Sequence, residues 1–590
     1  MTPRPVSRAL ALSLFVLVLN TAYVASRNLI PEAASSDHGT HHQGIIADTP
    51  ASSDPPPGAD EARRQRPLEC FQVAQPVLGP NGPVYQEVAR GDGDGEGIPP
   101  ADPTECKVHL MDHSFGNSFD KPFVGEYTPP GCDFNRVIVN FTATSAGRQL
   151  DRLALWYLGD TEVWRTSTAE PRAAPGIIWT YWKDMTPYLS LWKSPQKIIF
   201  DLPNLIDDRY TGPFNCTLTA TFFKSDAESD NAPPADLIIP ISSRNASSNT
   251  GSAWQVPERE AVSTVKFPRN ANRAVFSVSA NGQGTEEFWW SNVLESDAAA
   301  FNATVGMAPA GSPWREVQVL IDDELAGVQW PFPVIFTGGV VPSFHRPLVG
   351  LDAYDLREHE IDISPWLPVL SDGQEHTFKI KVAGIADEGD RVFVNTTGTK
   401  NPEWTQNLSY TNNATLGQFG RNGFNNFIIT GTDALLNGLV RYQSTYSYPL
   451  IVNQTANMTA AGDLNLDATL FQELRLEVEG AGVYPTGLEA YNAPNRNRQG
   501  QNEQYTVSKL STFRNGTAVF SMPADMKNSS AFGTTRQVFR FSGGRDGARD
   551  VELYMRRVKA SNNTVLCDEE KSADGRERVL SVPSLSGGAN

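Results

Sequence analysis

Short apolar stretches separated by turn-forming residues constrain this chain more than any other feature. Residues 147–182 show the pattern, with the sequence GRQLDRLALWYLGDTEVWRTSTAEPRAAPGIIWTYW. A polar turn leads into an apolar stretch, a Gly-Asp turn follows, and a second strand-like stretch ends in a polar Thr-Ala-Glu-Pro segment. Leu153 to Leu158 are apolar on both faces, as expected for a strand in the middle of a sandwich. Strands and turns at this spacing predict an antiparallel sandwich or jelly roll.

The same pattern recurs along the chain, whereas helical periodicity is hard to find. Between 136 and 142, apolar side chains alternate, so that Val137, Val139 and Phe141 face one side of a strand. The predicted fold class is all-β, with two adjacent antiparallel jelly-roll or β-sandwich domains and a C-terminal β-rich region. Further strands are expected at 177–181, 197–201, 216–223, 274–278, 317–321, 376–382, 391–394, 473–479, 517–522 and 537–541.

Length and local composition set the expected domain boundaries. A chain of 590 residues is too long for one hydrophobic core, and polar, Pro-rich or Gly-rich stretches divide it. We expect a signal peptide at 1–26, a mostly disordered linker at 27–104, a first β-sandwich at 105–225, a second at 237–395, a loop or linker at 396–424, a C-terminal β-rich domain at 425–570 and a flexible tail at 571–590.

The N-terminus has the composition of a secretory signal peptide. Two arginines precede an apolar run from Ala9 to Leu19, and small residues follow at 24–26. The alternative is an uncleaved anchor, although Asn20 and Thr21 end the run short of the ~20 apolar residues that a spanning helix needs. We therefore expect a secreted protein, with a signal-anchored membrane or vacuolar protein as the alternative.

Secretion predicts an N-glycosylated protein with disulfide bonds. The five cysteines are an odd number, so at least one is unpaired or intermolecular. Their spacing does not decide the pairing, but Cys106 and Cys132 flank one hairpin-like unit and fit a disulfide. The others are Cys70, Cys216 and Cys567. Acceptor sequons begin at Asn140, Asn215, Asn245, Asn302, Asn395, Asn407, Asn413, Asn453, Asn457, Asn515, Asn528 and Asn562.

Charge and ligand spacing argue against two classes of partner. The net charge of −18 argues against a duplex nucleic-acid partner. His109, Asp112 and His113 have the residue types of a metal site, but in a strand Asp112 would point away from the face that the histidines share. No cysteine lies in a CxxC motif or beside a histidine motif. We expect neither a metal site nor thiol catalysis.

Ordered motifs between about residues 105 and 360 give this region a family resemblance. Besides the 147–182 block they are His113-Ser114-Phe115-Gly116, Lys121-Pro122, Tyr127-Thr128-Pro129-Pro130, Asn204-Leu205-Ile206-Asp207, Tyr210-Thr211-Gly212, Gly284-Thr285-Glu286-Glu287-Phe288-Trp289, Trp330-Pro331-Phe332-Pro333-Val334-Ile335 and Thr337-Gly338-Gly339. In this combination the chain resembles the eukaryotic peptide:N-glycosidase A family, in a fungal-type form. These proteins are secreted amidases that remove N-glycans from asparagine.

The resemblance implies an activity, a substrate class and a processing event. The expected reaction hydrolyses the β-aspartylglucosaminyl bond of an N-glycopeptide or denatured glycoprotein, converts Asn to Asp, and needs no metal or organic cofactor. Some members of the family are cut into two chains that stay associated, and a loop at 396–420 would suit such a cut. A catalytically inactive β-sandwich lectin that binds N-glycans is the alternative function, because a scaffold does not guarantee activity. A structural cell-wall glycoprotein is a third possibility.

Asp151 is the first candidate for the catalytic base. The Leu-Asp-Arg triplet is similar to the Trp-Asp-Arg triplet of the distantly similar bacterial peptide:N-glycosidase, whose Asp is the base, although Leu150 replaces the Trp. The simpler interpretation is an aspartate at a strand edge that pairs with Arg152 or Arg148. Arg152 could itself support the oxyanion or bind Asp151, but in a regular strand it would point away from that face.

Glu287 is the second catalytic candidate. It precedes three aromatic residues, which would lower the local dielectric and raise the pKa of a carboxyl group. The bacterial enzymes carry a Glu followed by Trp at a similar position, and Glu287 fits it best, with Glu286 left open. The simpler interpretation is a strand with outward glutamates and inward aromatics.

The resemblance also implies residues that bind the substrate. The bacterial enzymes use another Glu after a comparable strand, and Asn204 or Asp207 would substitute for it here. Indole rings stack on sugar rings, which gives Trp156, Trp289 and Trp290 a candidate role in lining the sugar site.

Overall fold

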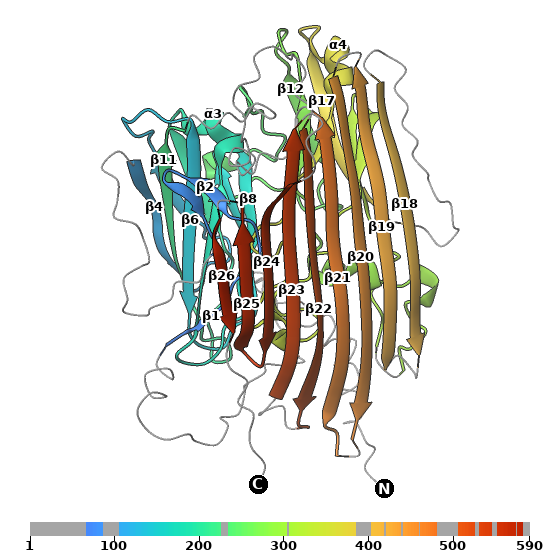
Figure 1. Cartoon of the computed structure of the whole chain (residues 1–590). Coiled ribbons are helices and arrows are strands. Elements are labelled where there is room, and N and C mark those ends of the chain that lie inside the picture. The colour runs from blue at the N-terminus through green and yellow to red at the C-terminus, as the bar shows by residue number, and fades with distance from the viewer. Residues whose placement is uncertain are drawn as a thin grey trace, which may run out of the picture.

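The computed structural model describes residues 66–86, 106–225, 234–303, 306–384, 403–417, 421–437, 440–459, 461–480, 506–524, 530–545, 551–573 and 575–581. The prediction of an all-β fold is confirmed, because most regular elements in these ranges are strands. Figure 1 shows a large C-terminal sheet (orange to red) with two smaller assemblies of strands beside it. The predicted signal peptide at 1–26 and the predicted strand at 391–394 lie outside the described residues.

The first unit is a sandwich of two sheets with an aromatic core. Phe141 of the larger sheet packs edge-on against Trp164 of the smaller one, with the ring centroids 5.5 Å apart. The larger sheet has the order β1 (Leu68–Glu69), β9 (Ile177–Asp184), β6 (Arg136–Ser145), β11 (Phe214–Phe223) and β4 (Cys106–Phe115). The smaller has the order β5 (Phe123–Tyr127), β10 (Gln196–Asp201), β7 (Leu153–Leu158) and β8 (Thr161–Ser167). The short helices η1 (Thr186–Tyr188) and α3 (Leu189–Trp192) connect β9 to β10.

Strand β6 explains why some strands here are apolar on both faces. Val137, Val139 and Phe141 point into the core of the sandwich, as their alternation predicted. Ile138, on the opposite face, is buried under the hairpin of β2 (Val77–Gly79) and β3 (Gly82–Val84), where it contacts Leu78. The hairpin thus covers the outer side of this strand.

The second unit has a four-stranded sheet and a two-stranded one. The larger has the order β12 (Ala261–Lys266), β17 (Glu375–Ala383), β14 (Glu316–Ile321) and β15 (Glu324–Gln329), and β13 (Val275–Val278) pairs with β16 (His359–Asp362). The strands predicted at 274–278, 317–321 and 376–382 agree with β13, β14 and β17. The short helices are η2 (Ala246–Ser248), η3 (Gly284–Glu286), η4 (Trp289–Ser291), η5 (Glu295–Asp297), η6 (Pro342–His345), η7 (Ser364–Trp366) and α4 (Leu367–Leu370).

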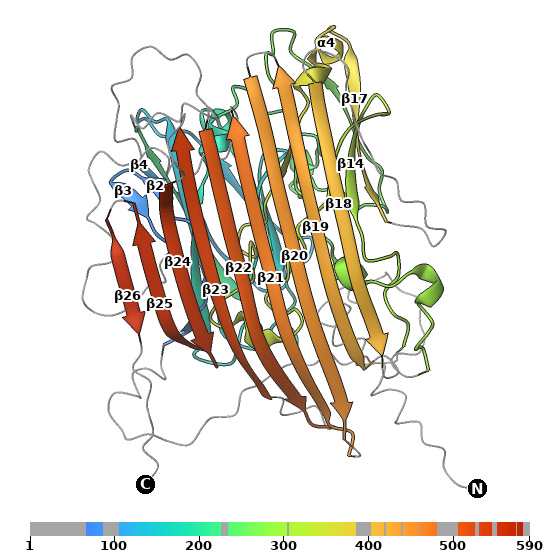
Figure 2. The same cartoon turned by 45° about the vertical axis from the view of Figure 1, so that its right-hand side comes forward.

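The C-terminal region is one antiparallel sheet whose nine strands follow sequence order. Figures 1 and 2 show it lying across both of the other units. One hydrophobic core joins its inner face to Phe71 of the first unit and to Trp289 and Phe344 of the second, so the region is not a separate domain. Its strands are β18 (Glu403–Gly417), β19 (Asn422–Asn437), β20 (Val440–Met458), β21 (Leu464–Gly480), β22 (Thr506–Met522), β23 (Ser530–Arg545), β24 (Val551–Ser561), β25 (Thr564–Ser572) and β26 (Glu577–Ser581).

A long segment between β15 and β16, residues 330–358, lies between the three assemblies. On the side of the first unit, the Ser167 amide donates to the Ala353 carbonyl (2.8 Å). On the side of the large sheet, the Gln537 side chain donates to the Val349 carbonyl (2.5 Å). Since buried main-chain groups need hydrogen-bond partners, these contacts fix the path of the segment.

The predicted loop or linker at 396–424 is wrong over much of its length. Residues 403–417 form β18, and the predicted boundary at 425 divides β19. The Asn-rich and Thr-rich composition belongs to the solvent face of a strand, since Asn407 and Asn413 are exposed while Gln406 is buried. A strand with one buried face and one solvent-exposed face carries polar residues at alternate positions. Its average composition resembles that of a loop unless the alternation is considered.

Two further boundaries also differ from the prediction. Residues 66–86, inside the predicted disordered linker at 27–104, pack against the first unit, with Cys70 fully buried and β1 paired to β9. The predicted tail at 571–590 includes β26, which pairs with β25. β1 pairs with a strand far along the chain, whereas β26 pairs with the strand that directly precedes it.

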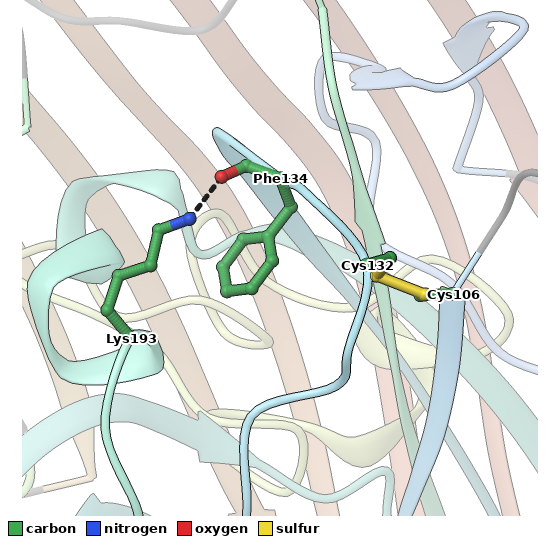
Figure 3. The surroundings of a disulfide bond; sticks show 4 residues. All are labelled: Cys106, Cys132, Phe134 and Lys193. Carbon is green, nitrogen blue, oxygen red and sulfur yellow. Dashed lines mark hydrogen bonds between the residues drawn. A yellow bond between two sulfur atoms is a disulfide. The ribbon is translucent and has the colours of Figure 1, made fainter.

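The structure contains the disulfide that the hairpin argument favoured, between Cys106 and Cys132. Figure 3 shows the ammonium group of Lys193, just after α3, hydrogen-bonded to the carbonyl of Phe134. The same ammonium lies 3.5 Å from the centre of the Phe134 ring. Among the described residues, no helix combines the length and the apolar composition needed to cross a membrane.

We expect replacement of both Cys106 and Cys132 by serine to lower the free energy of unfolding by about 3 kcal/mol, because the bond closes a loop with a sequence separation of 26. Denaturant-induced unfolding of oxidised wild type and variant measures the change. Reductant should destabilise the wild type but not the variant, and equal sensitivity of the two would contradict the assignment.

Candidate functional site

Asp151 and Glu170 lie close together because one hairpin carries both. Asp151 shortly precedes β7, Glu170 shortly follows β8, and the two strands are antiparallel neighbours. Main-chain contacts extend the hairpin outward: the Arg152 amide donates to the Thr168 hydroxyl, and the Thr168 amide donates to the Arg152 carbonyl, both at 2.8 Å. The entry to one strand and the exit from the next therefore bring two acids to the same end of the first sandwich.

Glu287 approaches the same place from the second unit. It lies between η3 and η4, so its segment is a pair of helical turns and not the strand of the simpler interpretation. The neighbouring Phe288 ring packs on Gly339, where an added methyl group would lie 2.9 Å from it. The negative charge of Asp151 raises the pKa of Glu287, an effect that requires proximity of the two carboxyl groups.

Gly338 joins these acids to the segment 330–358. Its backbone lies against the Asp151 carboxylate and lowers the pKa of that group. A methyl group added at Gly338 would lie 2.5 Å from Asp151 Oδ1 and 3.4 Å from Glu170 Oε2. Only glycine lets the main chain approach both acids this closely. Asp151, Glu170 and Glu287 are called the acid cluster below.

The three members of the acid cluster differ in acidity. Burial raises the pKa of Asp151, and its own amide, Arg152, the Gly338 amide and Arg346 each oppose that rise. Burial and the Asp151 charge raise the pKa of Glu287 well above its ordinary value, and no opposing contribution offsets them. Glu287 is 7% exposed, whereas Asp151 keeps more contact with solvent. The environment therefore favours an ionised Asp151 beside a protonated Glu287.

Glu170 is the third acid and has a cation beside it. It is 5% exposed, and burial raises its pKa to about 7, against the attraction of Arg346 and with the repulsion of Asp151. Arg346 NH2 lies 3.6 Å from Glu170 Oε1 and donates to the carbonyls of Glu170 (3.2 Å) and Pro171 (3.3 Å). In the part of the chain that the structure describes, Oε2 is buried without a hydrogen-bond partner.

Arg152 and Asn204, two predicted substrate-binding residues, support the acid cluster from behind. The Arg152 guanidinium donates to Gln149 Oε1 (2.8 Å) and to Asn204 Oδ1 (3.4 Å). The Asn204 amide donates to the Phe115 carbonyl (3.0 Å), and the side chain is fully buried. Asn204 therefore does not replace a third acid, while the charge of Arg152 lowers the pKa of Asp151.

Glu286 and Asp207 lie in other contacts. Glu286 forms an ion pair with Arg315 and accepts a hydrogen bond from Asn292 (3.2 Å), so Glu287 is the glutamate of this pair that belongs to the acid cluster. Asp207 is exposed and accepts the amides of Arg209 and Tyr210, both at 2.7 Å, as expected for an aspartate that closes a turn.

Trp156 and Trp289, two of the three tryptophans predicted to line the sugar site, are packed in hydrophobic cores. Trp156 is fully buried inside the first sandwich, between Trp164 and Trp192. Trp289 is also buried and packs edge-on against Phe427 of β19, with the ring centroids 5.4 Å apart. The prediction that their faces line a sugar site is wrong, because protein atoms already cover both rings.

Sequence reasoning missed Glu170, Gly338 and Arg346. Glu170 belongs to the polar Thr-Ala-Glu-Pro segment and Gly338 to a quoted motif, but no local pattern indicated that they meet. The signal that could have found Glu170 is the antiparallel pairing of the two strands in the 147–182 block. Among the described residues, no group of three or more His, Cys, Asp or Glu side chains is arranged to hold a metal ion.

These features define a β-sandwich protein whose acid cluster is suited to hydrolysis. An ionised carboxylate beside a protonated one provides a base and an acid at one place. Residues 93–412 match the model of the family described as peptide N-acetyl-beta-D-glucosaminyl asparaginase amidase A, and residues 393–450 match its C-terminal domain. The chain belongs to this family, which confirms the family resemblance.

One relative and two solved structures show how similar this chain is to known proteins. Over 296 residues the chain is 37% identical to peptide-N4-(N-acetyl-beta-glucosaminyl)asparagine amidase A of Prunus dulcis, covering 47% of this chain and 51% of that protein. The chain thus spans about half the length of this curated relative. PNGase F of Flavobacterium meningosepticum is 11% identical, with a TM-score of 0.30, and covers 48% of this chain and 90% of that one. A structure of PNGF-II is 12% identical, with a TM-score of 0.29, and covers 48% and 63%. No inference is drawn from similarity at these scores.

We expect Glu170→Gln to weaken the pH dependence of stability. The pKa of Glu170 is raised from 4.5 to about 7 in the folded protein, which therefore holds this proton more tightly than the unfolded chain. The resulting stabilisation is present below about pH 4.5 and is lost as the pH rises through about 7, a loss of roughly 3 kcal/mol.

Denaturant unfolding of wild type and variant near pH 5 and near pH 8 checks this prediction. The variant should lose less stability across the interval. Glu126→Gln, which removes an exposed carboxyl group from β5, controls for the loss of one acid. If wild type and Glu170→Gln lost the same amount of stability between the two pH values, Glu170 would not be held protonated in the folded protein.

Proposed function

We propose that this protein is a peptide:N-glycosidase that hydrolyses the β-aspartylglucosaminyl bond of N-glycopeptides or denatured glycoproteins. The observation that carries the proposal is the acid cluster, in which Asp151 and Glu287 come from different units and burial raises the pKa of Glu287 without the opposing contributions that limit the rise at Asp151. The membership of the chain in the amidase family and the activity for which its Prunus dulcis relative is named support the choice of substrate. The narrower assignment to a fungal-type member stays a prediction, because that relative is from a plant.

Asp151 acts as the base in this mechanism. Its carboxylate accepts a proton from water while the water oxygen bonds to the side-chain carbonyl carbon of the substrate asparagine. The Gly338 amide and the charges of Arg152 and Arg346 oppose the rise in the pKa of Asp151 that burial causes, which favours the ionised form that this step requires. The partial exposure of Asp151 gives water access to the carboxylate.

Glu287 acts as the acid. When the carbon–nitrogen bond breaks, its proton passes to the departing nitrogen, so the products are an aspartyl peptide and a glycosylamine that then loses ammonia. Burial next to Asp151 keeps Glu287 protonated until that step. Glu170, paired with Arg346, supplies a third polar group for the first sugar. Burying carboxyl groups costs free energy. A lectin would not need buried acids with raised pKa values, so the amidase is favoured over the lectin.

We further propose that the protein is secreted and N-glycosylated. The disulfide supports an oxidising compartment, and the sequon residues Asn407, Asn413, Asn453, Asn457 and Asn515 are all exposed on strands of the large sheet. The association of two cut chains, and the absence of metal and nucleic-acid partners, stay predictions. Residues 403–417 are unsuited to a cut because they pair with β19.

Asp151→Asn should reduce glycan release by roughly 100- to 10,000-fold, because it removes the base without changing side-chain size. A fluorescent N-glycopeptide is incubated with the purified protein, and mass spectrometry measures conversion of Asn to Asp. Asp207→Asn, which changes an exposed aspartate outside the cluster, is the matched control and should leave release unchanged. Near wild-type turnover by Asp151→Asn would remove this residue from the mechanism. Intact glycopeptide retained by the wild type would instead support the lectin.

Expression of the full chain in a eukaryotic secretory host should yield medium-borne protein whose electrophoretic mobility increases after chemical deglycosylation. Replacement of Asn453 and Asn515 by Gln should remove part of that shift. Protein retained in the cell without glycans would contradict the proposed secretion.

A further inference from the structure

Arg514 is a buried cation in the middle of the large sheet. It lies on β22, its side chain is 0% exposed, and burial lowers its pKa to about 9. Among the described residues no carboxylate pairs with it. Arg556, an equally buried arginine on β24, is by contrast paired with Asp568 at 2.9 Å. Because an unpaired buried charge is costly, the contacts that Arg514 does make require an explanation.

Those contacts end on the helical turn η6. Arg514 NH2 donates to the Phe344 carbonyl (2.9 Å), which also accepts from the Thr535 hydroxyl of β23 (2.8 Å). Arg514 NH1 lies 3.3 Å from His345 Nδ1. Side chains of β22 and β23 in the large sheet therefore hydrogen-bond to the last residues of η6.

The contact with Arg514 determines which nitrogen of His345 carries the proton. A guanidinium only donates, so Nδ1 must accept and the proton sits on Nε2. Burial and the Arg514 charge both lower the pKa of His345 well below its ordinary value, which keeps the ring neutral. Nε2 then donates to the Gly339 carbonyl at 2.8 Å.

Gly339 is adjacent to the glycine whose amide contacts the acid cluster. Gly338 lies against the Asp151 carboxylate and lowers its pKa, and the ring of Phe288, next to Glu287, packs on Gly339. The turn also continues into Arg346, which pairs with Glu170. The turn held by Arg514 thus reaches the segments that carry all three acids.

We infer that Arg514 is a positioning residue for the active site: through neutral His345 it orients the Gly338–Gly339 peptide so that the Gly338 amide holds the Asp151 carboxylate. This inference rests on the proposed function and assigns a role in it to the C-terminal sheet. Arg514 touches none of the acids, and it acts only through the turn.

Arg514→Met keeps the volume and removes the donors. The Gly338 amide should lose its fixed direction, and Asp151 should then ionise only at higher pH. We expect the acidic limb of the kcat profile to move upward by roughly one pH unit and kcat near neutral pH to fall about tenfold, with KM within about twofold of wild type. His345→Leu should have the same effect, whereas His345→Gln, which can accept from Arg514 and donate to Gly339, should restore most of the activity.

Arg556→Met is the matched control, because it removes a buried arginine of the same sheet whose hydrogen bonds go to Asp568 and Gln86 and not to η6. It should lower the melting temperature without moving the pH profile. A profile of Arg514→Met that is superimposable on that of Arg556→Met, or a loss in His345→Gln equal to that in His345→Leu, would overturn the inference. A wild type that releases no glycan would contradict the proposed function instead. In that case crystal structures of wild type and Arg514→Met still decide the inference, since an unchanged orientation of the Gly338–Gly339 peptide beside Asp151 would refute it.

Discussion

The buried main chain of residues 330–358 needs hydrogen-bond partners, and the architecture depends on how they are supplied. Gln472 of the large sheet donates to the Pro333 carbonyl (2.6 Å), and Trp164 of the first sandwich donates to the Tyr354 carbonyl (3.0 Å). Polar side chains that point inward from otherwise apolar strands are thus paired with main-chain groups of this segment. The three assemblies share one irregular segment as a common interior layer, which explains why the hydrophobic core does not follow the domain boundaries that composition predicted.

Desolvation gives the acid cluster its chemical character. Three carboxyl groups lie among protein atoms with fewer cations than acids, so their protonation states cannot be independent. Contacts with neighbouring groups lower the pKa of Asp151 and none lowers that of Glu287, and this asymmetry supports the two roles proposed for them. Because the asymmetry comes from the surroundings and not from residue type, the same pair of residue types elsewhere in the chain would not be functional.

The sequence predicted local features well and long-range ones poorly. Alternation and turn residues located β7, most strands of the first unit and β13, β14 and β17 of the second, and a family motif next to a strand made Asp151 a candidate. Glu170 was missed because strand pairing, and no pattern along the chain, places it beside Asp151. β18 was predicted as a loop because its outward side chains are Asn, Ser and Thr, and its inward residues face a core that appears only after folding. Trp156 was assigned to sugar binding because an indole suits a core and a ligand equally well, and burial alone distinguishes them.

The order in which the acid cluster is completed has a consequence during synthesis. Its carboxyl groups are translated by residue 287 and its glycine by residue 338, but the strands that hold η6 end only at Met522 and Arg545. A nascent chain therefore carries every acid long before the support for their arrangement exists. The arrangement of the acid cluster that the folded protein shows is therefore complete only after the large sheet has been translated as far as β23.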